Sequence, residues 1–69
     1  MPIVRIEMLP GRSQETKQRV AAEVTQVLAR ELGVAPAHIY VMFSEVPAAD
    51  WAVGGGFLAA PSSTNASGG

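Results

Sequence analysis

The sequence contains no cysteine and only one histidine, His38. Without cysteine, the chain has no disulfide bond, no thiol nucleophile and no zinc–thiolate site. A single histidine is also too few to build a metal cluster. We therefore predict a protein that holds no metal and stabilises its fold by other means.

The sequence also lacks a strong excess of charge. Five basic and six acidic residues give a net charge of −1, which does not indicate nucleic acid or an anionic membrane as a partner. No basic segment followed by an apolar stretch marks a secretory signal, and no apolar run approaches transmembrane length. We expect a cytoplasmic protein.

Apolar residues, in contrast, are abundant for so short a chain. They make up 48% of 69 residues, although a chain of this length is one domain at most and struggles to bury a core by itself. Because disulfides and metals are excluded, the remaining solution is association. We predict an oligomer whose subunits cover apolar surface on one another.

The first predicted element is a strand at Pro2–Leu9, which ends at the turn dipeptide Pro10-Gly11. Apolar residues alternate along it with Arg5 and Glu7, as expected for a strand with one apolar face. Pro2 shares the parity of the apolar face formed by Val4, Ile6 and Met8.

The second predicted element is a helix over Gln14–Leu32. Ser13 is a favourable N-cap, and Gly33 suits the position that ends a helix. The apolar spacing follows one helical face, and the other face is charged and expected to be solvated. The apolar set is Val20, Ala21, Val24, Val27, Leu28 and Leu32; the charged or polar set is Lys17, Arg19, Glu23, Gln26 and Arg30.

The third predicted element is a strand at His38–Val46, preceded by Pro36 and ended by Pro47. Strand–helix–strand with short links predicts a parallel pair joined by a right-handed crossover. We therefore expect an α/β (α+β) fold: a β-α-β domain over residues 1–60 with a C-terminal hairpin hinged at Gly54–Gly56. Residues 61–69 are small and polar and read as a flexible tail.

The first two residues, Met1-Pro2, indicate a candidate catalytic amine. Proline is small enough for the initiator methionine to be removed, which would leave Pro2 with a secondary amine. An α-amino group has a pKa of roughly 7.7–8.0, and apolar surroundings or a nearby cation lower it. Such an amine can act as a general base near neutral pH.

Several short motifs resemble, in their order and spacing, the 4-oxalocrotonate tautomerase family. They are Met1-Pro2-Ile3, Leu9-Pro10-Gly11-Arg12-Ser13, Glu45-Val46-Pro47 and Trp51-Ala52-Val53-Gly54-Gly55. The resemblance implies an isomerase without a cofactor, built as a homohexamer from three dimers. It also implies that the amine of Pro2 takes a proton from an enol and returns it to a remote carbon.

The resemblance assigns three further residues to substrate binding. Arg12 matches the arginine that holds a substrate carboxylate, although an arginine beside a turn is usually solvated. Tyr40 stands where the best-known members have a second arginine; it can donate one hydrogen bond to an oxyanion, or simply pack at an interface. Trp51 matches an aromatic wall of the site and equally suits a subunit contact.

We therefore predict a tautomerase acting on a small enol or keto acid, with a monocarboxylate more plausible than 4-oxalocrotonate because Tyr40 carries no charge. One alternative is a hydratase or dehalogenase of unsaturated acids, which requires an acidic residue to activate water. Glu7 has the wrong strand parity to face Pro2, and Glu45 has no assigned role. Another alternative is a catalytically silent subunit that completes a mixed site with a partner chain.

Overall fold

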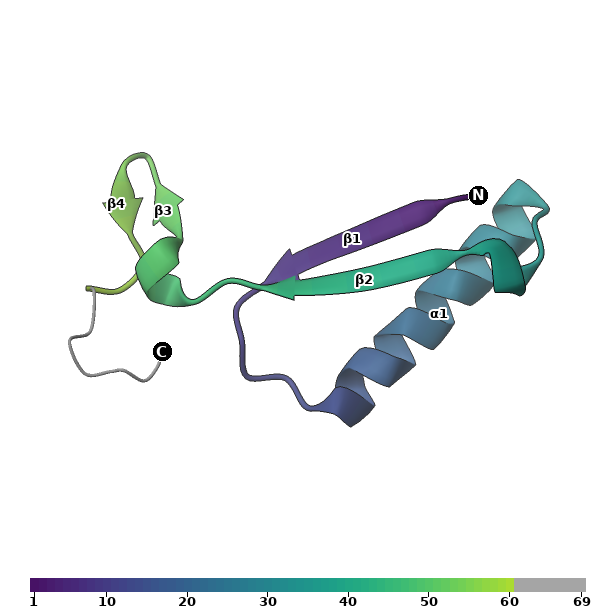
Figure 1. The fold of residues 1–69 in the computed structure, drawn as a ribbon, viewed down its shortest axis with the longest axis horizontal. Helices are drawn as coiled ribbons and strands as arrows, with labels where there is room; N and C mark the ends of the chain where they lie inside the picture. The colour runs from purple at the N-terminus through teal and green to yellow at the C-terminus, as the bar shows by residue number, and fades with distance from the viewer. Residues whose placement is uncertain (61–69) are drawn as a thin grey trace.

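The computed structural model describes residues 1–60, and the predicted tail at 61–69 lies outside the described residues. Figure 1 shows a parallel β1-β2 pair, a helix along one side of it and a hairpin that projects from the end of β2. The predicted fold class is confirmed. The elements are β1 (Ile3–Met8), α1 (Gln14–Leu32), the 3-10 turn η1 (Pro36–His38), β2 (Tyr40–Glu45), the 3-10 turn η2 (Ala48–Asp50), β3 (Ala52–Val53) and β4 (Gly56–Phe57).

The parallel pair runs in register from Ile3 opposite Tyr40 to Met8 opposite Glu45. Backbone hydrogen bonds extend the ladder beyond both ends. The Tyr40 amide donates to the Pro2 carbonyl oxygen at 3.0 Å, and the Val46 amide donates to the Met8 carbonyl oxygen at 2.9 Å. The sheet therefore holds the backbone on either side of β1 as well as β1 itself.

The predicted alternation along β1 is confirmed. Val4, Ile6 and Met8 are half-buried, whereas the residues between them are exposed. In a parallel pair, residues opposite each other point to the same side, so Val41 and Phe43 share the half-buried face. The other face of the sheet is open.

Helix α1 begins and ends where its capping residues predict. The Ser13 hydroxyl accepts a hydrogen bond from the Thr16 amide at 3.1 Å, satisfying one of the free amides of the first turn. Gly33 adopts a left-handed conformation with φ of +69°, and its amide donates to the Ala29 carbonyl oxygen.

The second strand is shorter than predicted. Pro36 starts a 3-10 turn that contains His38, and the Ile39 amide donates to the Pro36 carbonyl oxygen at 3.0 Å. This turn uses the backbone groups that a longer ladder would need, so the strand begins at Tyr40 rather than His38. The fixed φ of proline favours such a turn.

The predicted hinge is a tight hairpin turn. Val53 lies opposite Gly56, so Gly54 and Gly55 form a two-residue loop, and both have positive φ, at 60° and 89°. That combination is the requirement of a type I′ turn, which glycine meets without strain. The Leu58 amide closes the base of the hairpin on the Trp51 carbonyl oxygen at 2.8 Å.

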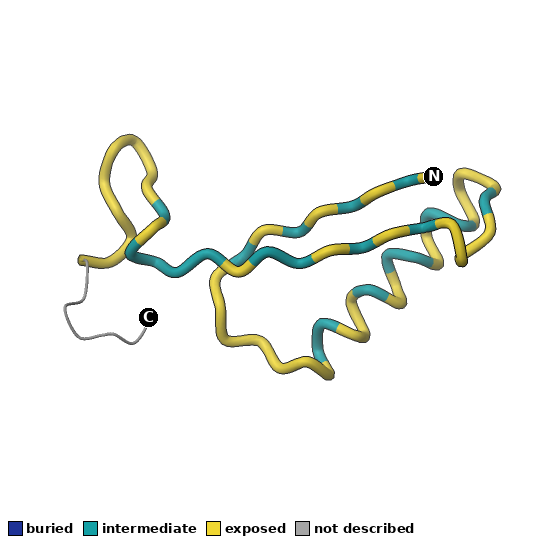
Figure 2. Tube along the Cα trace, viewed as in Figure 1, coloured by how far each residue is buried: buried dark blue, intermediate teal, exposed yellow. Residues whose placement is uncertain are grey.

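A single subunit has almost no interior. Within residues 1–60 no hydrophobic side chain is fully buried, and Figure 2 shows only half-buried and exposed positions along the described chain. The radius of gyration is 15.7 Å, whereas a compact chain of this length has about 11 Å. The subunit is therefore an open, extended unit.

The predicted apolar face of α1 is only partly covered. Val24 and Leu28 are half-buried, but Val20, Val27 and Leu32 remain 37%, 45% and 56% exposed. The reason is the width of the sheet, because two strands about 4.8 Å apart are no wider than one helix.

No helix within residues 1–60 is long and apolar enough to cross a membrane.

Candidate active site

Pro2 lies immediately before β1 and is half-buried. Its carbonyl oxygen is fixed by the Tyr40 amide, and its side chain shares the parity of Val4 and Ile6 on the face toward α1. Met1 precedes it with 77% of its surface exposed. The ladder thus fixes the backbone of Pro2, whereas Met1 is exposed to solvent.

Tyr40 is the first residue of β2 and lies opposite Ile3. Its side chain is 52% exposed on the open face of the sheet, together with Ile3 at 60%. Since Pro2 and Ile3 point to opposite faces, the Tyr40 hydroxyl is directed away from the face of its own Pro2. The two residues are backbone neighbours whose side chains do not meet.

Arg12 lies in the loop between β1 and α1, directly before the N-cap Ser13. It is exposed, and within residues 1–60 its guanidinium makes no hydrogen bond or ion pair. An arginine held at a helix start without an internal partner has all its donors available to an incoming carboxylate.

Trp51 follows η2, and its amide donates to the Ala48 carbonyl oxygen at 3.3 Å. The side chain is half-buried and borders a pocket of about 240 Å³. The other residues that line this pocket are Glu7, Val46, Asp50 and Ala52. The pocket therefore combines one large aromatic wall with two carboxylates.

The four predicted site residues fall at two ends of the sheet. Pro2 and Tyr40 lie where β1 and β2 begin, whereas Arg12 and Trp51 lie beyond the ends of those strands (Figure 1). The six residues of β1 span about 20 Å at about 3.3 Å each. Within one copy of the chain, Pro2 is therefore separated from Arg12 and Trp51 by the length of the sheet.

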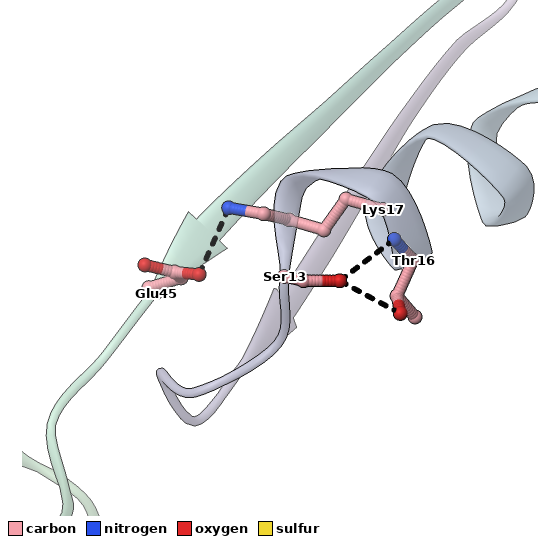
Figure 3. A network of polar contacts seen from close by, with 4 residues as sticks. All are labelled: Ser13, Thr16, Lys17 and Glu45. Carbon is pink, nitrogen blue, oxygen red and sulfur yellow. Dashed lines mark hydrogen bonds and ion pairs between the residues drawn. The ribbon is translucent and has the colours of Figure 1, made fainter.

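The sequence did not predict an ion pair between the start of α1 and the end of β2. Lys17, predicted to be solvated, places its Nζ 2.9 Å from Oε2 of Glu45, which had no assigned role (Figure 3). A signal was present in the spacing: Lys17 lies four and seven residues before Ala21 and Val24, on the stripe of α1 that faces the sheet. Glu45 likewise has the parity of Phe43.

Glu15 and Arg19, one turn apart on α1, form a surface contact. The carboxylate and guanidinium are 3.6 Å apart, and both side chains are largely exposed. Among residues 1–60, no group of three or more aspartate, glutamate or histidine side chains gathers closely enough to hold a metal ion.

Comparison with known proteins agrees with this arrangement. Residues 2–60 match the family described as tautomerase enzyme. A probable tautomerase of Ralstonia nicotianae is 38% identical over 55 residues, covering 80% of this chain and 85% of that protein. The 2-hydroxymuconate tautomerase of Comamonas testosteroni is also 38% identical, covering 80% of this chain and 87% of that protein.

Solved structures share the fold. YwhB, a homologue of 4-oxalocrotonate tautomerase, superposes with a TM-score of 0.80 at 30% identity, over 88% of this chain and all of that chain (100%). A heterohexamer 4-oxalocrotonate tautomerase from Chloroflexus aurantiacus superposes with a TM-score of 0.77 at 36% identity, over 84% of this chain and 94% of that chain.

The elements form a small β-α-β unit with a parallel strand pair and a C-terminal hairpin, the fold that these solved structures share. The chain belongs to the tautomerase family. The predicted resemblance to 4-oxalocrotonate tautomerase is confirmed, and so is its class, a tautomerase-like isomerase.

Proposed function

We propose that this chain is a cofactor-free tautomerase in which Pro2, after removal of Met1, is the general base for a small enol or keto acid. The observation that carries the proposal is the hydrogen bond from the Tyr40 amide to the Pro2 carbonyl oxygen, at 3.0 Å. It holds Pro2 at the start of a ladder without using the nitrogen. Met1 is exposed, so its loss leaves the ladder intact.

The proposed reaction moves one proton. The secondary amine accepts the proton of the enol hydroxyl, and the resulting ammonium delivers it to the carbon at the far end of the enol double bond, or of the conjugated system in a dienol. The electron pair of the O–H bond forms the C=O bond of the ketone, and the electron pair of the C=C bond forms the new C–H bond. Only a deprotonated amine has the lone pair this requires, and apolar surroundings disfavour the charged form of an amine. Arg12 binds the substrate carboxylate, and Tyr40 donates a hydrogen bond to the developing oxyanion.

We further propose that the site is completed by neighbouring copies in a homo-oligomer, arranged as a hexamer of three dimers. Three features support this: the separation of Pro2 from Arg12, the absence of a fully buried hydrophobic residue within 1–60, and exposed apolar side chains on the hairpin. Val24, Val27 and Leu28 also line an open groove of about 220 Å³ on α1. The cytoplasmic location stays a prediction.

The charge of the site favours a substrate with one carboxylate. Tyr40 supplies no cation at the start of β2, and Glu7 and Asp50 line the pocket beside Trp51. A second carboxylate would meet repulsion there rather than a partner. We therefore propose phenylenolpyruvate, a monocarboxylate, as a better substrate class than 2-hydroxymuconate, a dicarboxylate.

The test is a comparison of both substrates with purified protein whose intact mass shows that Met1 is absent. Turnover of phenylenolpyruvate by this protein alone supports a self-sufficient enzyme. Activity that appears only after a second chain is added would replace the homo-oligomer with a mixed assembly.

A further inference from the structure

The Lys17–Glu45 ion pair differs from the other ion pairs of residues 1–60. It joins α1 to β2 through two residues that are 28 positions apart in the sequence, and its side chains are only 19% and 34% exposed. The Glu15–Arg19 pair lies within α1, with side chains 81% and 67% exposed. The Lys17–Glu45 ion pair is therefore a tertiary contact between α1 and β2, whereas the Glu15–Arg19 ion pair lies within one helix.

On one side, the ion pair closes the loop that carries Arg12. This loop leaves β1 at Met8, whose carbonyl oxygen accepts the Val46 amide at 2.9 Å, and enters α1 through the cap at Ser13. Lys17 is in the first turns of the helix, and Glu45 is adjacent to Val46 (Figure 3). Both ends of the Arg12 loop are thus fastened to the end of β2.

On the other side, the ion pair fixes the start of the segment that carries Trp51. Glu45 is the last residue of β2, and the segment from Val46 to Ala49 is half-buried throughout. It leads through η2 to Trp51, whose amide is held by the Ala48 carbonyl oxygen. Arg12 and Trp51 therefore lie on two segments that meet at one contact.

We propose that Lys17 and Glu45 are positioning residues that hold the carboxylate-binding Arg12 in place relative to Trp51. The inference rests on the proposed function, since it assigns the pair a role in the same site. Neither residue touches the substrate in this proposal. Their effect is geometric: a misplacement of about 1 Å lowers the efficiency of a site by as much as a hundredfold.

The experiment removes the ion pair and measures the effect on Arg12, through substrate binding, and on Trp51, through its fluorescence. Lys17→Met keeps most of the side-chain length without the charge, and Glu45→Gln keeps the shape of the carboxylate. The charge-exchanged double variant K17E/E45K restores a pair in reverse. Arg19→Met is the matched control because it removes the exposed pair within the same helix.

Trp51 provides a readout that does not depend on activity, because it is the only tryptophan in the sequence. We expect Lys17→Met and Glu45→Gln to increase quenching of Trp51 fluorescence by acrylamide. We also expect the KM for phenylenolpyruvate to rise roughly tenfold to a hundredfold with kcat unchanged. The double variant should restore both values, and the control should alter neither.

The proposal is overturned if Lys17→Met and Glu45→Gln leave the fluorescence and the KM unchanged, or if Arg19→Met changes them equally. If circular dichroism shows that one single variant does not fold, the other single variant and the double variant are used to test the proposal. If the wild-type protein has no activity, the proposed function fails, and the fluorescence measurements still decide whether the ion pair positions Trp51.

Discussion

The backbone amide of Tyr40 donates a hydrogen bond to the carbonyl oxygen of Pro2, at 3.0 Å, yet their side chains lie on opposite faces of the sheet. The ladder therefore fixes both residues at the same end of the subunit and keeps the Tyr40 hydroxyl from its own Pro2. We therefore expect Tyr40 to act toward a substrate at Pro2 of another copy, through the exposed face that Tyr40 shares with Ile3.

Replacing Tyr40 with arginine should change which substrate the protein prefers. Tyr40→Arg adds a cation that can pair with a second carboxylate, a charge-assisted interaction of about 1.5–3 kcal/mol. We expect kcat/KM for 2-hydroxymuconate to rise about tenfold or more relative to phenylenolpyruvate. Steady-state kinetics with both substrates measures the ratio.

The control for this substitution is Met42→Arg, which adds the same charge on the same face but two residues along β2. It should leave the ratio of the two substrates unchanged. An equal change with both arginine variants would mean that general electrostatic attraction, and not the position of Tyr40, sets the preference.

Arg12 should affect substrate binding without affecting the fold. Its side chain has no hydrogen bond or ion pair within residues 1–60, so Arg12→Ala leaves no internal group unpaired. We expect the KM for phenylenolpyruvate to rise about tenfold or more and the melting temperature to stay the same. Arg12→Lys keeps the charge but loses the bidentate geometry, so its KM should lie between those of the wild-type protein and Arg12→Ala.

The matched control is Arg19→Ala, another exposed arginine, which should leave the KM unchanged. If Arg12→Ala gives wild-type kinetics, Arg12 is a solvated residue at a turn and the carboxylate is bound elsewhere.

The N-cap of α1 predicts a defined loss of stability. Ser13→Ala removes the acceptor of the Thr16 amide, which costs about 1 kcal/mol of unfolding free energy. Ser13→Asp should retain that stability because its carboxylate also accepts the amide. Urea unfolding followed by circular dichroism at one fixed protein concentration measures both. Equal loss in both variants would indicate that the cap contributes nothing specific.

The bounds of α1 were predictable because they depend on neighbours in the sequence. Ser13 caps the first turn through its own side chain, and Gly33 ends the helix through its own φ. The apolar parity of β1 is local in the same sense. His38 was wrongly placed in a strand because the 3-10 turn started by Pro36 competes for the same backbone groups.

The rest of the candidate site depends on contacts across the chain. The spacing of Lys17 along α1 and the parity of Glu45 each point to the interior, but neither position identifies the other as its partner. Sequence order places Pro2 and Arg12 at opposite ends of β1, and the subunit alone leaves them there. In the proposed oligomer their convergence depends on other copies, whose arrangement no local pattern encodes.

The exposed apolar side chains of the hairpin predict a contact between subunits. Phe57 is 58% exposed in the single subunit, and burying such a side chain contributes about 1.5–3 kcal/mol. Phe57→Asp should therefore weaken the assembly. Light scattering after size-exclusion chromatography should show a wild-type mass well above the 7.2 kDa subunit and a lower mass for the variant.

The control for the assembly is Gln26→Asp, which places the same charge on the exposed polar face of α1. It should leave the mass unchanged. A wild-type protein that elutes as a single subunit would contradict the proposed oligomer outright.

The central claim is that the amine of Pro2 is the base, and Pro2→Ala tests it most directly. The measurement is kcat for phenylenolpyruvate, made on wild-type and variant proteins whose intact masses both lack Met1. The account predicts a fall of about 10²-fold, the low end of the range for general-base catalysis, because the alanine variant keeps only a freely rotating primary amine in place of the fixed secondary amine. The circular dichroism should not change, since the residue at position 2 still accepts the Tyr40 amide through its backbone. A variant that keeps the wild-type kcat, or a wild-type protein that is fully active with Met1 attached, would contradict it.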